Sequence, residues 1–117
     1  MFNFEKLDVW QAAIEFADLI YQLTNAFPAE EPFGLTNQMR RAAISVSSNI
    51  AEGRGRGSDP DFRRFLWHSL GSCNELEYDL LLARDLKFLP VALHTRLTGQ
   101  VEEVRRMLVG LIQSMTT

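Results

Sequence analysis

Apolar residues recur at helical spacing in four stretches of this chain, and a break rich in proline or glycine separates each stretch from the next. Recurrence at intervals of three and four residues indicates amphipathic helices, and the two-residue alternation of strands does not occur. An amphipathic helix must bury its apolar stripe against a neighbour. Four such helices with short connections predict an all-α fold, an up-and-down antiparallel four-helix bundle.

The first two helices have predictable ends. Asp8 is expected to cap the first helix, with Gln11 completing a capping box. The prolines that follow Phe27 interrupt the apolar pattern, because proline in a helix interior removes a hydrogen bond. The second helix is expected to run from about Leu35 to Glu52, and Gly53 is its expected stop, since glycine accepts the left-handed conformation that ends helices.

The last two helices are marked in the same way. Ser58-Asp59-Pro60 combines a capping residue with an early proline, which is typical of a helix start. This third helix is expected to continue to about Leu86. After Pro90, apolar residues recur with heptad-like spacing toward the C-terminus and predict the fourth helix.

Length and composition favour one compact domain over residues 1–117. The chain has 117 residues, of which 46% are hydrophobic, enough to bury one core without disulfides or metal ions. The single Cys73 excludes an internal disulfide and indicates a reducing, cytoplasmic setting. No stretch approaches the roughly 20 apolar residues of a membrane helix. We therefore expect a soluble cytoplasmic protein without a membrane partner.

The residue patterns of catalytic and metal sites are missing. Di-metal bundles need Glu-x-x-His pairs, but Phe65 and Val91 stand three positions before the two histidines, His68 and His94. Cys73 falls within a core stripe, where a thiol behaves as a small hydrophobe. The glycine loop that begins at Gly53 lacks the Lys-Ser/Thr of a phosphate-binding loop. The sequence therefore predicts no catalytic residues, no metal and no cofactor, and a chain that is not an enzyme.

Small polar residues and arginines gather around the end of the second helix. The net charge is −3, yet residues 40–64 hold six arginines and only three acidic residues. Serines are mediocre helix formers, so their small size favours close approach by another helix or by a ligand. An ion pair of Glu52 with Arg41 or Arg56 is an equally weighted alternative. The predicted partner-binding residues are Gln38, Arg41, Ser45, Ser48, Asn49, Glu52, Arg54 and Arg56.

The third helix carries a second apolar stripe beside the one expected to face the core. Its members are Trp67, Leu70, Tyr78 and Leu81. Each helix of a bundle touches two neighbours, so part of this stripe is expected to pack within the chain. Exposed aromatic residues with a polar atom are enriched at subunit interfaces. The stripe therefore predicts a homo-oligomer interface.

Most of the chain resembles a family of four-helix bundle proteins named for open reading frames in intervening sequences of bacterial 23S ribosomal RNA genes. The run Ser45–Gly53 (SVSSNIAEG) is the most specific part of this resemblance. The other segments that carry it are Phe4–Trp10, Gly34–Thr36 with Gln38, Arg40–Ala42, Gly55-Arg56, Phe62, Phe65-Leu66, Gly71-Ser72 and Glu75–Glu77.

The resemblance implies a cytoplasmic bacterial protein that assembles as a homopentamer and has no established activity. A similar fold serves as the accessory protein of diversity-generating retroelements, in which a basic pentamer associates with a reverse transcriptase and nucleic acid. This chain departs from that pattern because it is acidic overall.

Three functional hypotheses remain. The first is a non-enzymatic homo-oligomeric bundle that binds RNA or an RNA-associated protein through the second helix and the arginine loop. The second is a purely protein-binding or structural scaffold. The third is a small-ligand or enzymatic site that uses Glu52, Asn49 and Arg41.

Overall fold

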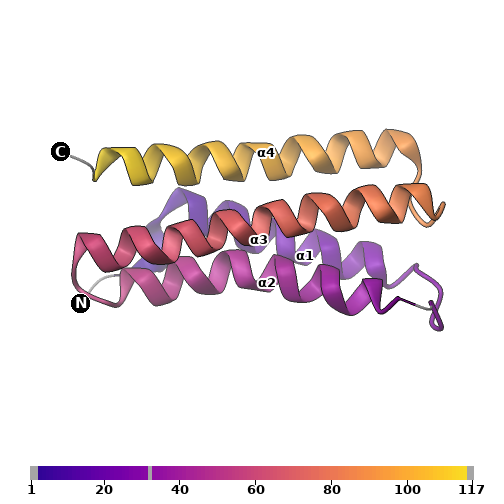
Figure 1. Cartoon of the computed structure of the whole chain (residues 1–117), viewed down its shortest axis with the longest axis horizontal. Coiled ribbons are helices and arrows are strands. Elements are labelled where there is room, and N and C mark those ends of the chain that lie inside the picture. Colours follow the sequence, from indigo (N-terminus) through magenta and orange to yellow (C-terminus); the bar gives the residue numbers. More distant parts are fainter. Residues whose placement is uncertain (1–2, 32, 116–117) are drawn as a thin grey trace.

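The computed structural model describes residues 3–31 and 33–115, and this part of the chain is helical apart from its connections. A short 3₁₀ helix, η1 (Phe4–Lys6), precedes α1 (Asp8–Thr24), α2 (Leu35–Arg54), α3 (Asp59–Asp85) and α4 (Val91–Ser114). Consecutive helices run antiparallel along a body of 45 × 22 × 21 Å (Figure 1). The predicted all-α four-helix bundle is confirmed.

One hydrophobic core runs along the bundle and takes residues from all four helices. The largest fully buried apolar side chains include Ile20, Met39, Ile50, Leu66, Leu80 and Leu108. Helices α2 and α3 share the most extensive contact, whereas α1 and α4 meet along the sparsest of the four seams. No helix in the described part of the chain has the length and apolarity needed to cross a bilayer.

The start of α1 differs from the prediction. Leu7, in an extended conformation, occupies the N-cap position, and Asp8 is already the first helical residue. The side chain of Gln11 does not complete a capping box but donates a hydrogen bond to the carbonyl oxygen of Glu5 at 3.0 Å. Because the 3₁₀ turn precedes it directly, α1 begins one residue earlier than predicted. The predicted capping role of Asp8 is therefore wrong.

The end of α2 also differs, because Gly53 lies inside the helix, which continues to Arg54. A methyl carbon built on Gly53 would lie 2.6 Å from the Cβ of Phe65 and 3.0 Å from a ring carbon of Phe62. Distances this short are far inside van der Waals contact. Glycine is therefore present at position 53 for close approach of α3, and not to end the helix.

Side chains cap the starts of α2 and α3, whereas Pro90 precedes α4 without a side-chain cap. Ser58 caps α3 as predicted, accepting a hydrogen bond from the backbone N–H of Asp61 at 3.4 Å. At α2, the N-cap is Gly34, which has a left-handed φ of 62° and no side chain to serve as a cap. The carboxylate of Glu31 takes that role, accepting from the N–H groups of Phe33 and Thr36 at 2.9 Å each. A carboxylate at this position also complements the positive end of the helix dipole.

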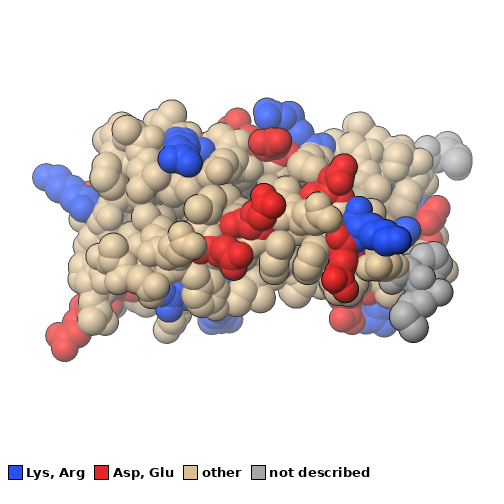
Figure 2. Space-filling view, turned by 180° about the vertical axis from the view of Figure 1, so that it is seen from behind, with Lys and Arg blue, Asp and Glu red and all other residues tan. Residues whose placement is uncertain are grey.

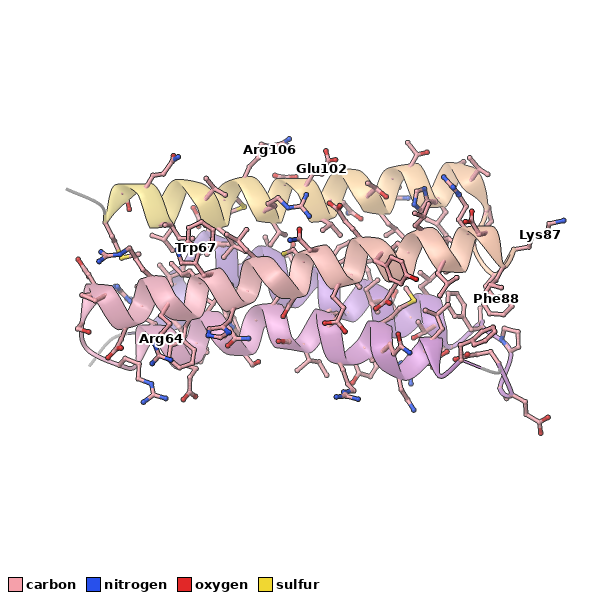
Figure 3. The ribbon with its side chains drawn as sticks, in the orientation of Figure 1. Arg64, Trp67, Lys87, Phe88, Glu102 and Arg106 are labelled. Carbon is pink, nitrogen blue, oxygen red and sulfur yellow. The ribbon has the colours of Figure 1, made fainter. Side chains whose placement is uncertain are left out.

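The end of α3 is a Schellman motif without the usual glycine. The N–H of Phe88 donates to the carbonyl of Ala83 at 2.9 Å, and that of Lys87 donates to the carbonyl of Arg84 at 3.0 Å. Lys87 therefore adopts a left-handed φ of 65°. Its side chain extends away from the end of the bundle, whereas Phe88 turns inward and packs against Phe27 at 5.5 Å between ring centroids (Figure 3).

Arginine side chains tie neighbouring helices together, among them Arg63 of α3, which donates to the carbonyl of Met115 at the end of α4 at 2.8 Å. Arg40 of α2 donates to the hydroxyl of Thr24 at the end of α1 at 2.8 Å. Arg105 of α4 donates to the side-chain oxygen of Asn74 at 2.8 Å and pairs with the carboxylate of Glu77, both on α3. These contacts fix the relative register of the helices on either side of the core.

Candidate functional site

Part of the partner-binding surface predicted on α2 packs against α3 and is not available to a partner. Ser45 accepts a hydrogen bond from the hydroxyl of Ser72 at 2.7 Å, and the side-chain amide of Asn49 donates to the Ser45 carbonyl at 2.8 Å. Beside this pair, Ser69 donates to the carbonyl of Val46 at 2.9 Å. The small residues therefore do permit close approach by another helix, and that helix is α3 of the same chain.

The outer edge of the same surface remains exposed. Gln38, Arg41, Ser48 and Glu52 all lie on the solvent side of α2. Gln38 donates to the carbonyl of Phe33, so it is partly engaged with the loop before the helix. Arg41 forms no hydrogen bond or ion pair with any residue that the structure describes. The surface left for a partner is narrower than predicted and centres on Arg41 and Ser48.

Glu52 forms an ion pair, which was one of the two interpretations of this residue. Its carboxylate lies 2.8 Å from the guanidinium of Arg56, one helical turn further along the chain. Both side chains are half-exposed, so the pair contributes at most about 1 kcal/mol to stability. Arg41, the other proposed partner, has no contact with Glu52.

The arginines at this end of the bundle lie against aromatic rings. Arg56 and Arg64 contact the ring of Phe65, with guanidinium carbons 4.9 and 4.8 Å from its centroid. Arg54 lies 5.5 Å from the ring of Phe62. Cation–π contacts of this kind orient a guanidinium without neutralising its charge. Arg56 is also paired with Glu52, and Arg64 pairs with Asp61 at 3.5 Å. The end of the bundle that contains the α2–α3 turn therefore displays guanidinium groups that are positioned by aromatic rings and partly offset by acidic neighbours.

The second stripe of α3 divides into a buried part and an exposed part. Trp67, Tyr78 and Leu81 are 61%, 64% and 40% exposed. Leu70 is 8% exposed and belongs to the hydrophobic core of its own chain, so it offers little surface for a subunit contact. Trp67 is labelled in Figure 3, where its side chain lies on the near side of α3. The interface prediction therefore rests on the two aromatic residues and Leu81.

Two titratable groups are buried within α3. Burial raises the pKa of the Cys73 thiol to about 11; Arg105 opposes and Glu77 reinforces this shift. A thiol with this pKa stays protonated at neutral pH and is a poor nucleophile. Burial, with a contribution from Glu75, raises the pKa of Asp79 to about 6.

Asp79 was missed by the sequence analysis. Its side chain is 1% exposed, and one of its carboxylate oxygens has no hydrogen-bond partner among the described residues. A signal was available, because an acidic residue stands among the core positions Leu76, Leu80 and Ala83 at helical spacing. No cation in the described part of the chain lies within hydrogen-bonding distance of Asp79, so its burial weakens the fold at neutral pH.

The histidines do not come together with other ligating groups. His68 is exposed on α3, and His94 lies 3.3 Å from the hydroxyl of Thr98 within α4. Across residues 3–31 and 33–115, no three His, Cys, Asp or Glu side chains are placed to hold a metal ion.

A groove between α1 and α4 is a feature that periodicity alone did not reveal. It has a volume of about 170 Å³ and an apolar floor that includes Phe16, Leu19 and Val104. Glu15 of α1 and Glu103 of α4 also line it. The groove follows from the sparse contact between these helices, which depends on how the side chains pack and not on their spacing in the sequence.

Similar proteins place this fold in a known family. The sequence model of the 23S rRNA-intervening sequence protein family matches residues 5–110. The chain is also similar to a crystal structure from Bacteroides thetaiotaomicron, that of a protein of unknown function from the S23 ribosomal protein family. The two share 25% identity and a TM-score of 0.80 over 89% of this chain and 97% of that one. No curated protein matches the sequence. The chain belongs to the 23S rRNA-intervening sequence protein family.

Proposed function

We propose that this protein is a non-enzymatic helical bundle that self-associates and binds RNA or an RNA-associated protein. The observation that carries the proposal is the outer face of α3, where two aromatic side chains, Trp67 and Tyr78, are more than half exposed with Leu81 beside them. Large aromatic residues are far more common in interfaces than on free surfaces. Self-association would bury this apolar surface against a second copy of the chain.

A glycine on the same face supports this argument. Gly71 lies between Trp67 and Tyr78, and a methyl group built on it would meet no atom within 4 Å. Glycine in a helix interior costs about 1 kcal/mol relative to alanine. Contacts within the chain do not offset this cost, whereas contacts with a closely packed neighbouring subunit would offset it.

The arginine end of the bundle supports a polyanionic partner. Arg54, Arg56 and Arg64 are each held against an aromatic ring, and Arg41 is exposed further along α2. Guanidinium groups match phosphate geometry and remain charged at every physiological pH. Assembly of several subunits would multiply this patch although the single chain is acidic. The family name connects the genes of such proteins with 23S rRNA, which makes structured RNA the first ligand to test.

Self-association is tested by light scattering coupled to size-exclusion chromatography over a range of protein concentrations. We expect a mass of several subunits for the wild-type chain and a lower mass for Trp67→Glu. Val91→Glu provides the matched control, because Val91 is also strongly exposed but lies at the start of α4. A monomeric wild-type chain at every concentration would contradict the proposal.

RNA binding is tested by fluorescence anisotropy with structured ribosomal RNA fragments at increasing salt. Affinity should fall steeply with salt, and the double variant Arg54→Ala/Arg56→Ala should reduce the log–log slope by roughly 1–2, since each phosphate contact contributes about 0.9. Arg96→Ala/Arg106→Ala removes the same charge from α4 and should change the slope less. Unchanged binding in the first double variant would refute this role for the arginine end.

The scaffold alternative predicts a different result. A chain that binds only proteins should show no RNA affinity at low salt, and a partner recovered at native expression levels should remain bound after nuclease treatment. The small-ligand alternative near Glu52 has little room, because the hollow beside it, bordered by Gly53 and Phe62, measures about 40 Å³.

A further inference from the structure

The lining of the groove between α1 and α4 suits an apolar group that carries a hydrogen-bond donor. Its floor includes Phe16, Leu19 and Val104, and the carboxylate-bearing Glu15 and Glu103 also line it. Gln100 borders the same groove, and its side-chain oxygen is buried without a hydrogen-bond partner among the described residues. A buried acceptor that lacks a donor is unfavourable, so an occupant that supplies one is favoured.

The outer face of α3 offers such an occupant. The indole of Trp67 combines a large apolar surface with one N–H group, which donates and cannot accept. Trp67 is 61% exposed and forms no hydrogen bond with any described residue. Arg64 lies one turn before Trp67 on the same surface of α3. Its guanidinium is more than half exposed and pairs with Asp61 at 3.5 Å through one nitrogen, so its other N–H groups can face the carboxylates of the groove.

The groove and the indole of one molecule face different directions. Trp67 and Arg64 lie on the near side of α3 in Figure 3. Helix α1, which forms one wall of the groove, lies behind α2 and α3 in Figure 1. Figure 2 presents that reverse side and shows acidic side chains gathered across its middle. A molecule therefore cannot fill its own groove with its own Trp67, but a second copy can.

We propose that Trp67 of one copy inserts into the α1–α4 groove of a second copy and donates a hydrogen bond to its acceptors. This inference rests on the proposed self-association and specifies its geometry. Because the two surfaces differ, the contact is heterologous. In a pair, the copy that gives its Trp67 keeps an unused groove, and the other copy keeps an unused indole. Heterologous contacts extend to closed rings or open chains, in contrast to the two-fold pairing of identical patches.

Complementary variants test this pairing. Trp67→Glu removes the indole and leaves the groove intact, whereas Ala12→Phe fills the groove from its own lining and leaves Trp67 intact. We expect each variant alone to be monomeric by sedimentation velocity. An equimolar mixture should form a one-to-one dimer that grows no further, because only one productive contact is possible.

The controls separate failure of this pairing from failure of self-association. Ala92→Phe places the same side chain at an exposed alanine of α4 outside the groove and should assemble as wild type. If the wild-type chain is itself monomeric, self-association fails and this inference fails with it. If wild type assembles but Ala12→Phe assembles equally well, or if the mixed variants do not dimerise, the pairing alone is overturned.

A second readout does not depend on the folding of the Ala12 variant. In a Trp10→Phe chain, Trp67 is the single tryptophan. Its emission should move to shorter wavelength as rising protein concentration drives assembly, because the indole leaves water for the groove. Emission that keeps the wavelength of an exposed indole throughout assembly would overturn the proposal.

Discussion

At the scale of single residues, a buried carboxyl group acts against the stability of the bundle. Asp79 is almost fully buried, and one of its carboxylate oxygens has no hydrogen-bond partner within residues 3–31 and 33–115. Burial raises its pKa to about 6 from a usual value of 3.8. The unfolded chain therefore releases this proton at lower pH than the folded chain. The stability that the protonated carboxyl provides is complete below the unfolded pKa and is lost as pH rises through about 6.

The variant Asp79→Asn tests this linkage. Asparagine is nearly isosteric and uncharged, so we expect its free energy of unfolding at pH 7.5 to exceed that of wild type by roughly 1–3 kcal/mol. The difference should shrink as the pH falls through the window between 6 and 4. Urea unfolding at several pH values measures it, with exposed Asp18→Asn as the control. A pH-independent difference would show that the charge of Asp79 is not the cause.

At the scale of elements, the ends of the helices show how far sequence patterns reach. The four apolar stripes and the Ser58 cap were predictable because they depend on neighbours within one or two turns. The continuation of α2 through Gly53 was not predictable, because it depends on the packing of Phe65, which belongs to another helix. The same limit applies to the candidate site. Exposure of Trp67 followed from its angle on α3, but the α1–α4 groove requires knowledge of how two helices pack.

Some glycines inside the helices are closely packed against another helix, and others face open space. Alanine substitution distinguishes the two kinds by its effect on stability. Gly53→Ala should lower the free energy of unfolding by about 1–3 kcal/mol, the usual effect of overpacking, because its new methyl group collides with Phe65. Gly71→Ala meets no other atom of its own chain, so it should raise helix stability by up to about 1 kcal/mol at protein concentrations low enough to keep the chain monomeric. Urea unfolding at matched protein concentration compares them. Equal effects of both substitutions would contradict the close approach at Gly53.

The end of α3 offers a stabilising change. Lys87 holds a left-handed conformation that costs an L-residue about 1 kcal/mol and costs glycine almost nothing. Lys87→Gly should therefore raise the melting temperature, with a gain below about 1 kcal/mol after the greater chain entropy of glycine is included. Lys87→Ala removes the same charge without relieving the strain and is the matched control. A gain shared by both variants would point to charge and not to backbone conformation.

At the scale of the whole molecule, the four seams of the bundle differ in strength. Helices α2 and α3 pack most closely, with Gly53 and a row of serines between them, and α1 meets α4 least. Regions with fewer buried contacts open at lower free energy than the most densely packed elements. The α2–α3 pair therefore forms the stable half of the bundle, and the proposed groove lies along the seam that is easiest to open.

Hydrogen exchange tests this order. Amides in the middle of α3, around Cys73 and Leu76, should exchange more slowly than those in the middle of α4, around Val101 and Val104. Mass spectrometry after pulse labelling resolves the two helices. If a neighbouring subunit fills the groove, exchange in α1 and α4 should slow at protein concentrations that favour assembly and stay fast in Trp67→Glu. Uniform protection of all four helices would contradict unequal seams.

The contact between Gly53 and Phe65 also restricts which second mutations can rescue a defect. The atom that would come closest to a side chain at position 53 is the Cβ of Phe65, which every residue except glycine possesses. Trimming the phenylalanine ring therefore cannot relieve the collision. In a genetic screen for suppressors of Gly53→Ala, we expect few second-site substitutions at position 65. They should arise instead along the serine row at Ser45, Ser69 and Ser72, where larger residues would let the two helices settle further apart.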